Sequence, residues 1–153
     1  MIKAYRLHSV KYAADDFTGA AKYGGRWNKP GTAALYTAAS RSLAVLEILV
    51  HYSVLPQDFQ MTEVRIPDRS GIFQAGVVRV WEPPRDVLPD RWWERPSFTA
   101  SVGDVLLENT AVLAVPSAVI HEEMNYVLNP ADPEFALIEF GPSEPFHFDH
   151  RLK

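Results

Sequence analysis

The feature that most constrains the fold of this chain is the segment SRSLAVLEILVHY, residues 40–52. Ser40 is a favourable helix N-cap and Pro56 lies shortly beyond the segment, so the pattern predicts a helix from Ser40 to about Tyr52. Apolar residues occupy nearly every face of this helix, which is typical of a helix that the rest of the domain encloses. Its one carboxylate, Glu47, should then be paired or used, because an isolated buried charge is costly.

The rest of the pattern predicts short, irregularly spaced strands. About seven strands and two or three helices are expected, and the helices do not alternate regularly with the strands, which favours an α+β fold over a doubly wound parallel sheet. The expected strands are residues 2–8, 34–37, 60–66, 77–81, the apolar stretch 111–115 and 118–121 interrupted at Pro116-Ser117, 135–140 and 146–150. A second long helix is expected to begin at Thr99 or Ser101 and to end near Asn109, while residues 9–31 and 125–133 should be mostly loop.

Length and composition predict a single domain, residues 1–153. The absence of cysteine excludes disulfides, thiolate metal sites and cysteine nucleophiles, and the five histidines lack metal-binding spacing, so no metal is expected. A net charge of -4 argues against direct nucleic-acid binding. The sequence shows neither a signal-peptide pattern nor a run of ~18 apolar residues, so we expect a cytoplasmic protein without membrane contact.

Three polar residues in one stretch are candidates for a binding or catalytic site. Arg26 follows two glycines, which let a backbone approach a ligand closely, and its guanidinium suits a phosphate. Tyr36 can stack on a flat ring, and the carboxylate of Glu47 can stabilise a positive charge. Each residue also has a simpler interpretation: Arg26 could stack on Trp27 at the surface, Tyr36 could belong to the core, and Glu47 could pair with His51, four residues later.

Two further features remain open at this level. Ser117 follows Pro116 between two apolar runs, where its hydroxyl could bind a ligand or only satisfy nearby backbone, and it lacks the Gly-x-Ser-x-Gly setting of a serine nucleophile. The Pro- and Trp-rich segment 83–96 cannot form one regular element. Its tryptophans could form a patch for a partner or fold back as a lid.

The stretch GGRWNKPGTAALYTAASRSLAVLEILVH, residues 24–51, strongly resembles the core signature of the RES-domain toxins, which are named after an arginine, a glutamate and a serine. The spacing from Arg26 through Tyr36 to Glu47 is the most specific part of this resemblance. Further similar landmarks are Tyr-Arg at residues 5–6, Val-Pro-Ser at 115–117 and NYVLNP at 125–130, so the resemblance covers essentially the whole chain. Segment 83–96 follows no family pattern.

The resemblance implies an ADP-ribosyltransferase-like split β core with a few helices around an NAD+ cleft. It also implies a toxin of a bacterial type II toxin–antitoxin pair that depletes NAD+ by breaking the nicotinamide–ribose bond, through hydrolysis or phosphorolysis. NAD+ would be the substrate, with no separate cofactor. The implied partner is an Xre-like helix-turn-helix antitoxin that covers the active site, and a homodimer within that hetero-complex is compatible with the family.

In this interpretation the catalytic residues are Glu47, Arg26 and Tyr36. Glu47 stabilises an oxocarbenium-like transition state, Arg26 holds a phosphate or ribose oxygen, and Tyr36 orients the nicotinamide. The expected substrate-binding residues are Arg6, Trp27, Asn28 and Ser117. Two alternatives stay open: a protein ADP-ribosyltransferase, which shares the first bond-breaking step, and a non-catalytic binding module in which Glu47 forms a structural pair.

Overall fold

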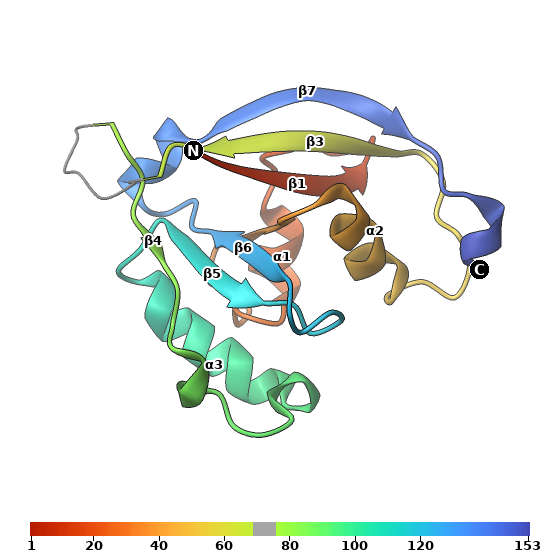
Figure 1. The fold of residues 1–153 in the computed structure, drawn as a ribbon. Helices are drawn as coiled ribbons and strands as arrows, with labels where there is room; N and C mark the ends of the chain where they lie inside the picture. The colour runs from red at the N-terminus through yellow and green to blue at the C-terminus, as the bar shows by residue number, and fades with distance from the viewer. Residues whose placement is uncertain (69–75) are drawn as a thin grey trace.

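The computed structural model describes residues 1–68 and 76–153, which form one seven-stranded sheet and three α-helices (Figure 1). The strand order is β4-β5-β6-β2-β1-β3-β7, and every neighbouring pair is antiparallel except β4 and β5. These elements confirm the predicted α+β class. The strands are β1 (Ile2–Ser9), β2 (Leu35–Ala38), β3 (Phe59–Ile66), β4 (Val80–Trp81), β5 (Val112–Pro116), β6 (Met124–Leu128) and β7 (Glu139–Phe146), and the helices are α1 (Thr18–Tyr23), α2 (Arg41–Leu49) and α3 (Pro96–Leu107).

The sheet is divided between β1 and β2. These two strands share only the pair Tyr5 and Ala38, whereas β1 and β3 pair along their whole length, from Ile2 with Ile66 to Ser9 with Phe59. Figure 1 shows the consequence: β1, β3 and β7 diverge from β4, β5 and β6, and α2 lies beside the division. The two parts of the sheet are therefore joined at the pair of Tyr5 and Ala38.

Helix α2 begins as predicted but is shorter and less enclosed. The Ser40 hydroxyl accepts a hydrogen bond from the backbone N–H of Leu43 at 3.1 Å, which is the expected N-cap. The helix ends at Leu49 rather than near Tyr52. Its buried side is formed by Leu43, Ala44, Val45 and Leu49. Leu46 and Val50 are 36% and 57% exposed, so the prediction of a helix enclosed on all sides is wrong: the sheet covers one side only.

Two predicted loops contain regular structure. Residues 9–31 include α1, and residues 125–133 include most of β6. The Asn and Pro residues of the run NYVLNP suggested a turn, but Asn125 lies inside the sheet, paired with Ala38 on β2 and with Val115 on β5. Tertiary pairing on both sides has overridden the weak strand propensity of asparagine.

Some predicted strands are also wrong. Residues 118–121 form a turn rather than a strand, and the two closing strands expected at 135–140 and 146–150 are replaced by a 3-10 helix, Pro133–Leu137, followed by the single strand β7. Strand β7 contains Pro142 and Pro145, which lie between the two expected strands. It tolerates them because it lies at the edge of the sheet, where proline removes no central ladder hydrogen bond.

Helix α3 packs closely against the turn of residues 24–32, which carries Arg26, Trp27 and Asn28. It begins at Pro96, earlier than predicted, because proline is favourable in the first helical turn. Gly103 faces the backbone of Trp27, and a Cβ atom at residue 103 would lie 1.9 Å from the Trp27 carbonyl oxygen. Segment 83–96 contains two short 3-10 helices, and its Trp92 is buried against Trp27 with ring centroids 5.7 Å apart. The helix and this segment thus support the turn from behind.

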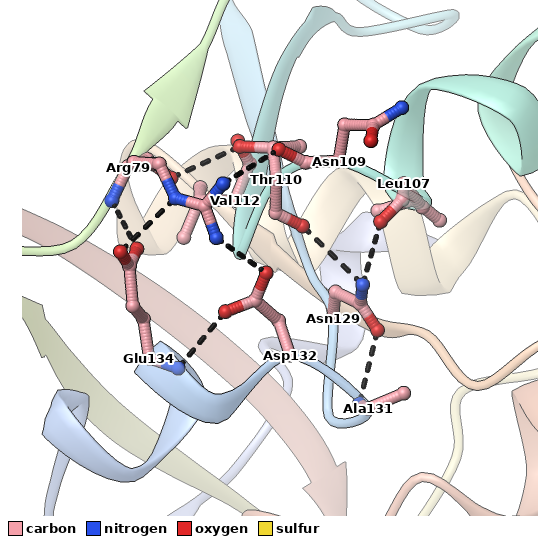
Figure 2. A network of polar contacts seen from close by, with 9 residues as sticks. All are labelled: Arg79, Leu107, Asn109, Thr110, Val112, Asn129, Ala131, Asp132 and Glu134. Atoms are coloured by element: carbon pink, nitrogen blue, oxygen red, sulfur yellow. Dashed lines mark hydrogen bonds and ion pairs between the residues drawn. The ribbon is translucent and has the colours of Figure 1, made fainter.

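A polar network joins β4, α3 and the end of β6 (Figure 2). Arg79 donates from its backbone N–H and Nε to Glu134, at 2.7 and 3.0 Å, and from Nη2 to Asp132 at 3.0 Å. Asn129 donates to the carbonyl oxygens of Leu107, at the C-terminus of α3, and of Thr110, and accepts from the backbone of Ala131. These contacts fix α3 and β4 against the sheet. We refer to the contacts of Arg79, Asn129, Asp132 and Glu134 as the Arg79 network.

In the part of the chain that the structure describes, no helix is long and apolar enough to cross a membrane. The same residues contain no cluster of three or more His, Asp or Glu side chains that could hold a metal ion.

Candidate active site

Glu47 on α2 is held by two neutral donors from the facing strands. Its Oε1 accepts a hydrogen bond from the Ser117 hydroxyl at 2.6 Å and another from Asn125 Nδ2 at 2.6 Å. Ser117 directly follows β5 and Asn125 lies in β6, so antiparallel pairing brings the two donors together. Among the described residues, Glu47 forms no ion pair. The simpler interpretation, a pair with His51, is therefore wrong.

The Ser117 hydroxyl has no capacity left for a ligand. It accepts hydrogen bonds from the backbone N–H groups of Val119 and Ile120, each at 3.0 Å, and donates its proton to Glu47. A hydroxyl has one donor and two acceptor positions, and all three are used. The residue is also 0% exposed. This geometry places Ser117 behind Glu47 instead of beside a substrate, in contrast to the predicted substrate contact.

Arg6 lies at the division of the sheet. Its guanidinium donates to the carbonyl oxygens of Tyr36 on β2 at 3.2 Å and of Asp16 at 3.1 Å. Its Nε is buried and has no hydrogen-bond partner among the described residues. Burial lowers the pKa of Arg6 to about 10, and the charges of Asp16 and Asp15 oppose that shift. The side chain remains cationic at neutral pH, and within the described residues it forms no ion pair. A partly buried cation that has no ion-pair partner among the described residues is suited to an anionic ligand.

Tyr36 is built into the turn of residues 24–32. Its hydroxyl donates to Asn28 Oδ1 at 2.6 Å and accepts from the backbone N–H of Trp27 at 2.9 Å. Gly25 lies against the ring, because a Cβ there would be only 2.7 Å from the Tyr36 hydroxyl oxygen. Burial raises the pKa of Tyr36 well above its usual value, so the phenol stays protonated.

Trp27 and Asn28, both predicted to bind substrate, face the interior. They are 2% and 1% exposed. Asn28 Nδ2 donates to the carbonyl oxygens of Ala20 and Thr32, each at 2.9 Å, and thereby holds the turn closed. Their side chains shape the turn that presents Arg26 and Tyr36.

Arg26 is linked to the Pro- and Trp-rich segment 83–96. Its Nη1 donates to the carbonyl oxygen of Trp93 at 2.7 Å. The Trp93 ring is stacked on His121, with centroids 3.9 Å apart, and Arg85 donates to the His121 carbonyl oxygen at 3.0 Å. The segment therefore connects Arg26 to the turn that follows Ser117.

The structure thus brings the predicted residues into two neighbouring groups. Glu47 and Ser117 are in direct contact, and Arg6, Tyr36, Trp27 and Asn28 form a second set of contacts. Strand β2 joins the groups, because it carries Tyr36 and also pairs with Asn125 through Ala38. Asn125 and Trp93 were not among the predicted site residues, although residues 125–130 resemble a family landmark and Trp93 belongs to the Pro- and Trp-rich segment 83–96. The available signal was a single asparagine preceding an apolar run, which was interpreted as a loop.

A cavity of about 750 Å³ lies elsewhere, among β4, α3 and the opposite face of β6. Tyr126 and Met124 line it, and the alternation of side chains along β6 places them on the face opposite to Asn125. Its size suits a small ligand. However, Arg79, the arginine that lines it, is already bound by Asp132 and Glu134. None of the predicted site residues lines this cavity, and the anchored carboxylate makes the Glu47 site the stronger candidate for chemistry.

The fold is an α+β fold with a divided sheet, and the candidate site is a carboxylate anchored beside that division. Comparison with known proteins shows which family has these features. Residues 3–149 match the RES domain family. A protein of Sphingobium sp. strain YBL2 named Prs ADP-ribosylating toxin is 36% identical over 149 residues, which cover 92% of this chain and 89% of the relative. The protein named Toxin Res of Yersinia enterocolitica is 36% identical over 159 residues, covering 97% of this chain and 98% of the relative.

The chain therefore belongs to the RES-domain family. A similar fold occurs in the crystal structure of the M. tuberculosis MbcT–MbcA toxin–antitoxin complex, with a TM-score of 0.65 and 17% identity over 94% of this chain and 83% of that chain. At this level of identity the comparison supports the fold alone.

Proposed function

We propose that this protein is the toxin of a toxin–antitoxin pair and that it cleaves the nicotinamide–ribose bond of NAD+. Membership of the RES-domain family and the toxin names of its relatives support the first part. The observation that carries the second part is the Glu47 carboxylate, fixed through Oε1 by Ser117 and Asn125.

The chemistry follows from where charge develops. When the bond between the nicotinamide nitrogen and the ribose breaks, its electron pair leaves with nicotinamide and positive charge builds on the ribose ring. A fixed carboxylate beside the ring stabilises that charge more in the transition state than in the ground state, and this difference accelerates the reaction. Glu47 is assigned this role.

The arginines would bind the anionic part of the substrate. Arg6 carries a positive charge that forms no ion pair with the described residues. Arg26 uses one donor on the Trp93 carbonyl oxygen, which leaves its remaining donors for a phosphate. Tyr36 would support the nicotinamide with its ring, since its hydroxyl is engaged by Asn28 and Trp27. NAD+ is then the substrate, and the reaction proposed here uses no further cofactor.

The acceptor of the ADP-ribose group defines a second candidate function. Water would give a glycohydrolase and phosphate a phosphorylase. Transfer to a protein is favoured by one specific observation, the name of the Sphingobium relative, Prs ADP-ribosylating toxin. All three outcomes begin with the same bond cleavage at Glu47.

The proposed partner is an antitoxin with an Xre-like helix-turn-helix that covers the Glu47 site. A protein with a similar fold was crystallised as a toxin–antitoxin complex, which supports a partner of this kind. Leu46 on α2 and Val50 directly after it are exposed apolar residues near Glu47 in the sequence, and they fit such a cover. A toxin of this kind would act in the cytoplasm, where NAD+ is available.

The test is to incubate the purified protein with NAD+ labelled in the adenosine part, with and without phosphate, and with or without added Prs protein. Free ADP-ribose identifies hydrolysis, ADP-ribose 1″-phosphate formed only with phosphate identifies phosphorolysis, and label on Prs identifies transfer. Glu47→Gln should abolish each product, whereas Glu108→Gln, at an exposed position after α3, should not. Intact NAD+ in every condition, with folded wild-type protein, would contradict the proposal.

A further inference from the structure

We propose that Asn125 is a positioning residue for Glu47, and that it leaves Oε2 as the carboxylate oxygen that acts on the substrate. This inference rests on the proposed function and adds to it. Asn125 donates from Nδ2 to Glu47 Oε1 at 2.6 Å, the same oxygen that accepts from Ser117. Within the described residues, no hydrogen bond is made to Oε2.

The orientation of the Asn125 amide is determined by its partner. An ionised carboxylate only accepts hydrogen bonds, so the amide must direct its NH₂ group, not its oxygen, at Glu47. Asn125 Oδ1 is then left buried without a partner among residues 1–68 and 76–153. Buried polar groups without partners are rare, and this one remains because the amide is held by its bond to Glu47.

Two donors fix the carboxylate better than one. Ser117 follows β5 and Asn125 lies in the neighbouring strand β6, and both donate to the same oxygen of Glu47. The Asn125 backbone is itself held in the sheet between Ala38 and Val115, so its side chain starts from a rigid position. With Ser117 alone, the carboxylate could rotate about that single hydrogen bond.

The choice of neutral donors has a chemical consequence. A lysine or arginine at residue 125 would also hold Glu47, but its positive charge would offset the negative charge that the transition state requires. An amide orients the carboxylate without neutralising it. Asn125 therefore suits a site in which the carboxylate must face positive charge on a ribose.

The experiment compares Asn125→Leu and Asn125→Asp with wild-type protein, using nicotinamide release from NAD+. Asn125→Leu keeps a similar volume but removes the donor. It should lower kcat about 10- to 100-fold, as expected for the loss of a hydrogen bond to a charged group, while KM changes less than about 3-fold. A fall in stability with kcat unchanged would overturn the inference, because a merely structural residue would behave in that way.

Asn125→Asp supplies a pH-dependent test. At about pH 8 the new carboxylate repels Glu47, so kcat should be strongly reduced. As the pH is lowered towards about 5, the pair takes up a shared proton and regains a hydrogen bond between the two side chains, so kcat relative to wild type should rise. A ratio to wild type that stays constant with pH would contradict a positioning role.

Asn109→Asp is the matched control. Asn109 is exposed after α3, and its side chain makes no hydrogen bond to the described residues, so the same chemical change there should leave kcat and its pH profile unaltered. Glu47→Gln distinguishes a failure of this inference from a failure of the proposed function. If wild type cleaves NAD+, Glu47→Gln does not, and both Asn125 variants match wild type, this inference fails alone. If wild type does not cleave NAD+, the proposed function fails and this inference fails with it.

Discussion

The Arg79 network and the contacts around Glu47 are both polar and partly buried, but only the first is complete. In the Arg79 network, Asn129 uses its amide oxygen and nitrogen, and Asp132 accepts from Arg79 and from the backbone of Glu134 (Figure 2). Around the division of the sheet, by contrast, Asn125 Oδ1 and Arg6 Nε are buried and have no hydrogen-bond partner in the part of the chain that the structure describes. The Arg79 network ties elements together. Among the described residues, the Glu47 site leaves Glu47 Oε2 without a hydrogen bond and leaves Arg6 and Arg26 without an ion pair, so these groups can serve a ligand.

This difference is a guide to function, because an unpaired buried polar atom lowers stability and is retained only for a reason. A choice by cavity volume alone would favour a different site. The cavity of about 750 Å³ adjoins the Arg79 network, whose charges are already matched, while the Glu47 site has the unmatched ones. The predictions below test this contrast, from the largest expected effect to the smallest.

Glu47→Gln should lower kcat for NAD+ cleavage about 10²- to 10³-fold, because it removes the charge that faces the ribose. The free energy of unfolding should change little, since the amide oxygen of glutamine can still accept from Ser117 and Asn125. Chromatography of the products formed over time gives kcat, and unfolding in urea gives the free energy of unfolding.

The same substitution in the other network, Glu134→Gln, is the control. It should weaken the contacts with Arg79 and lower stability by about 1 kcal/mol with kcat unchanged. A Glu134→Gln protein that loses activity as strongly as Glu47→Gln would remove the distinction between the two networks.

Gly103→Ala should lower both the stability and the activity of the protein. The added Cβ would meet the Trp27 carbonyl oxygen at 1.9 Å, so α3 or the turn of residues 24–32 must move. We expect a loss of about 3 kcal/mol in unfolding free energy together with reduced kcat, because the displaced turn carries Arg26. Gly19→Ala, at a glycine with nothing within 4 Å of the added Cβ, is the comparison. Wild-type stability in Gly103→Ala would show that α3 does not press on the turn.

Asn129→Ala should lower the free energy of unfolding by about 2 kcal/mol and leave kcat unchanged. The side chain is 8% exposed, and its removal leaves the carbonyl oxygen of Leu107 and the N–H of Ala131 without their partner. Asn109→Ala, at the exposed neighbouring site, should change stability by less than about 0.5 kcal/mol. Equal stability of the two variants would mean that the Arg79 network does not stabilise α3.

Stability should also fall in mild acid because of His8. Its ring accepts from or donates to Thr62 at 2.9 Å, and burial and the charge of Arg6 lower its pKa below the usual 6.5. The unfolded chain then binds a proton more readily than the folded one. The contribution is present above about pH 6.5 and is lost as the pH falls through and below that value. Unfolding in urea at about pH 7.5 and 5.5 should show a smaller pH effect in His8→Gln than in wild type, and an identical effect would contradict this assignment.

The elements that local pattern determines were predicted well. Strand β1 and the Ser40 cap follow from alternation and capping chemistry, and the α+β class follows from the order of elements. Strand β6 and the edge strand β7 were missed, because their Asn and Pro residues are tolerated only through pairing and edge position.

The candidate site was predictable by residue type but not by partner. The sequence indicated Glu47 as an unusual carboxylate, yet it suggested His51 as the partner because only local spacing is visible along a chain. The true partners, Ser117 and Asn125, are 70 and 78 residues away and are brought close by β5 and β6. For the same reason, the burial of Trp27 and Asn28 could not be inferred from their positions beside Arg26.

The most direct test of the central claim is a crystal structure of Glu47→Gln with intact NAD+. The account predicts that the nicotinamide ribose lies within about 3.2 Å of the residue 47 side chain, with Arg6 or Arg26 on the phosphates. NAD+ bound instead in the cavity between β4 and α3, away from residue 47, would contradict it.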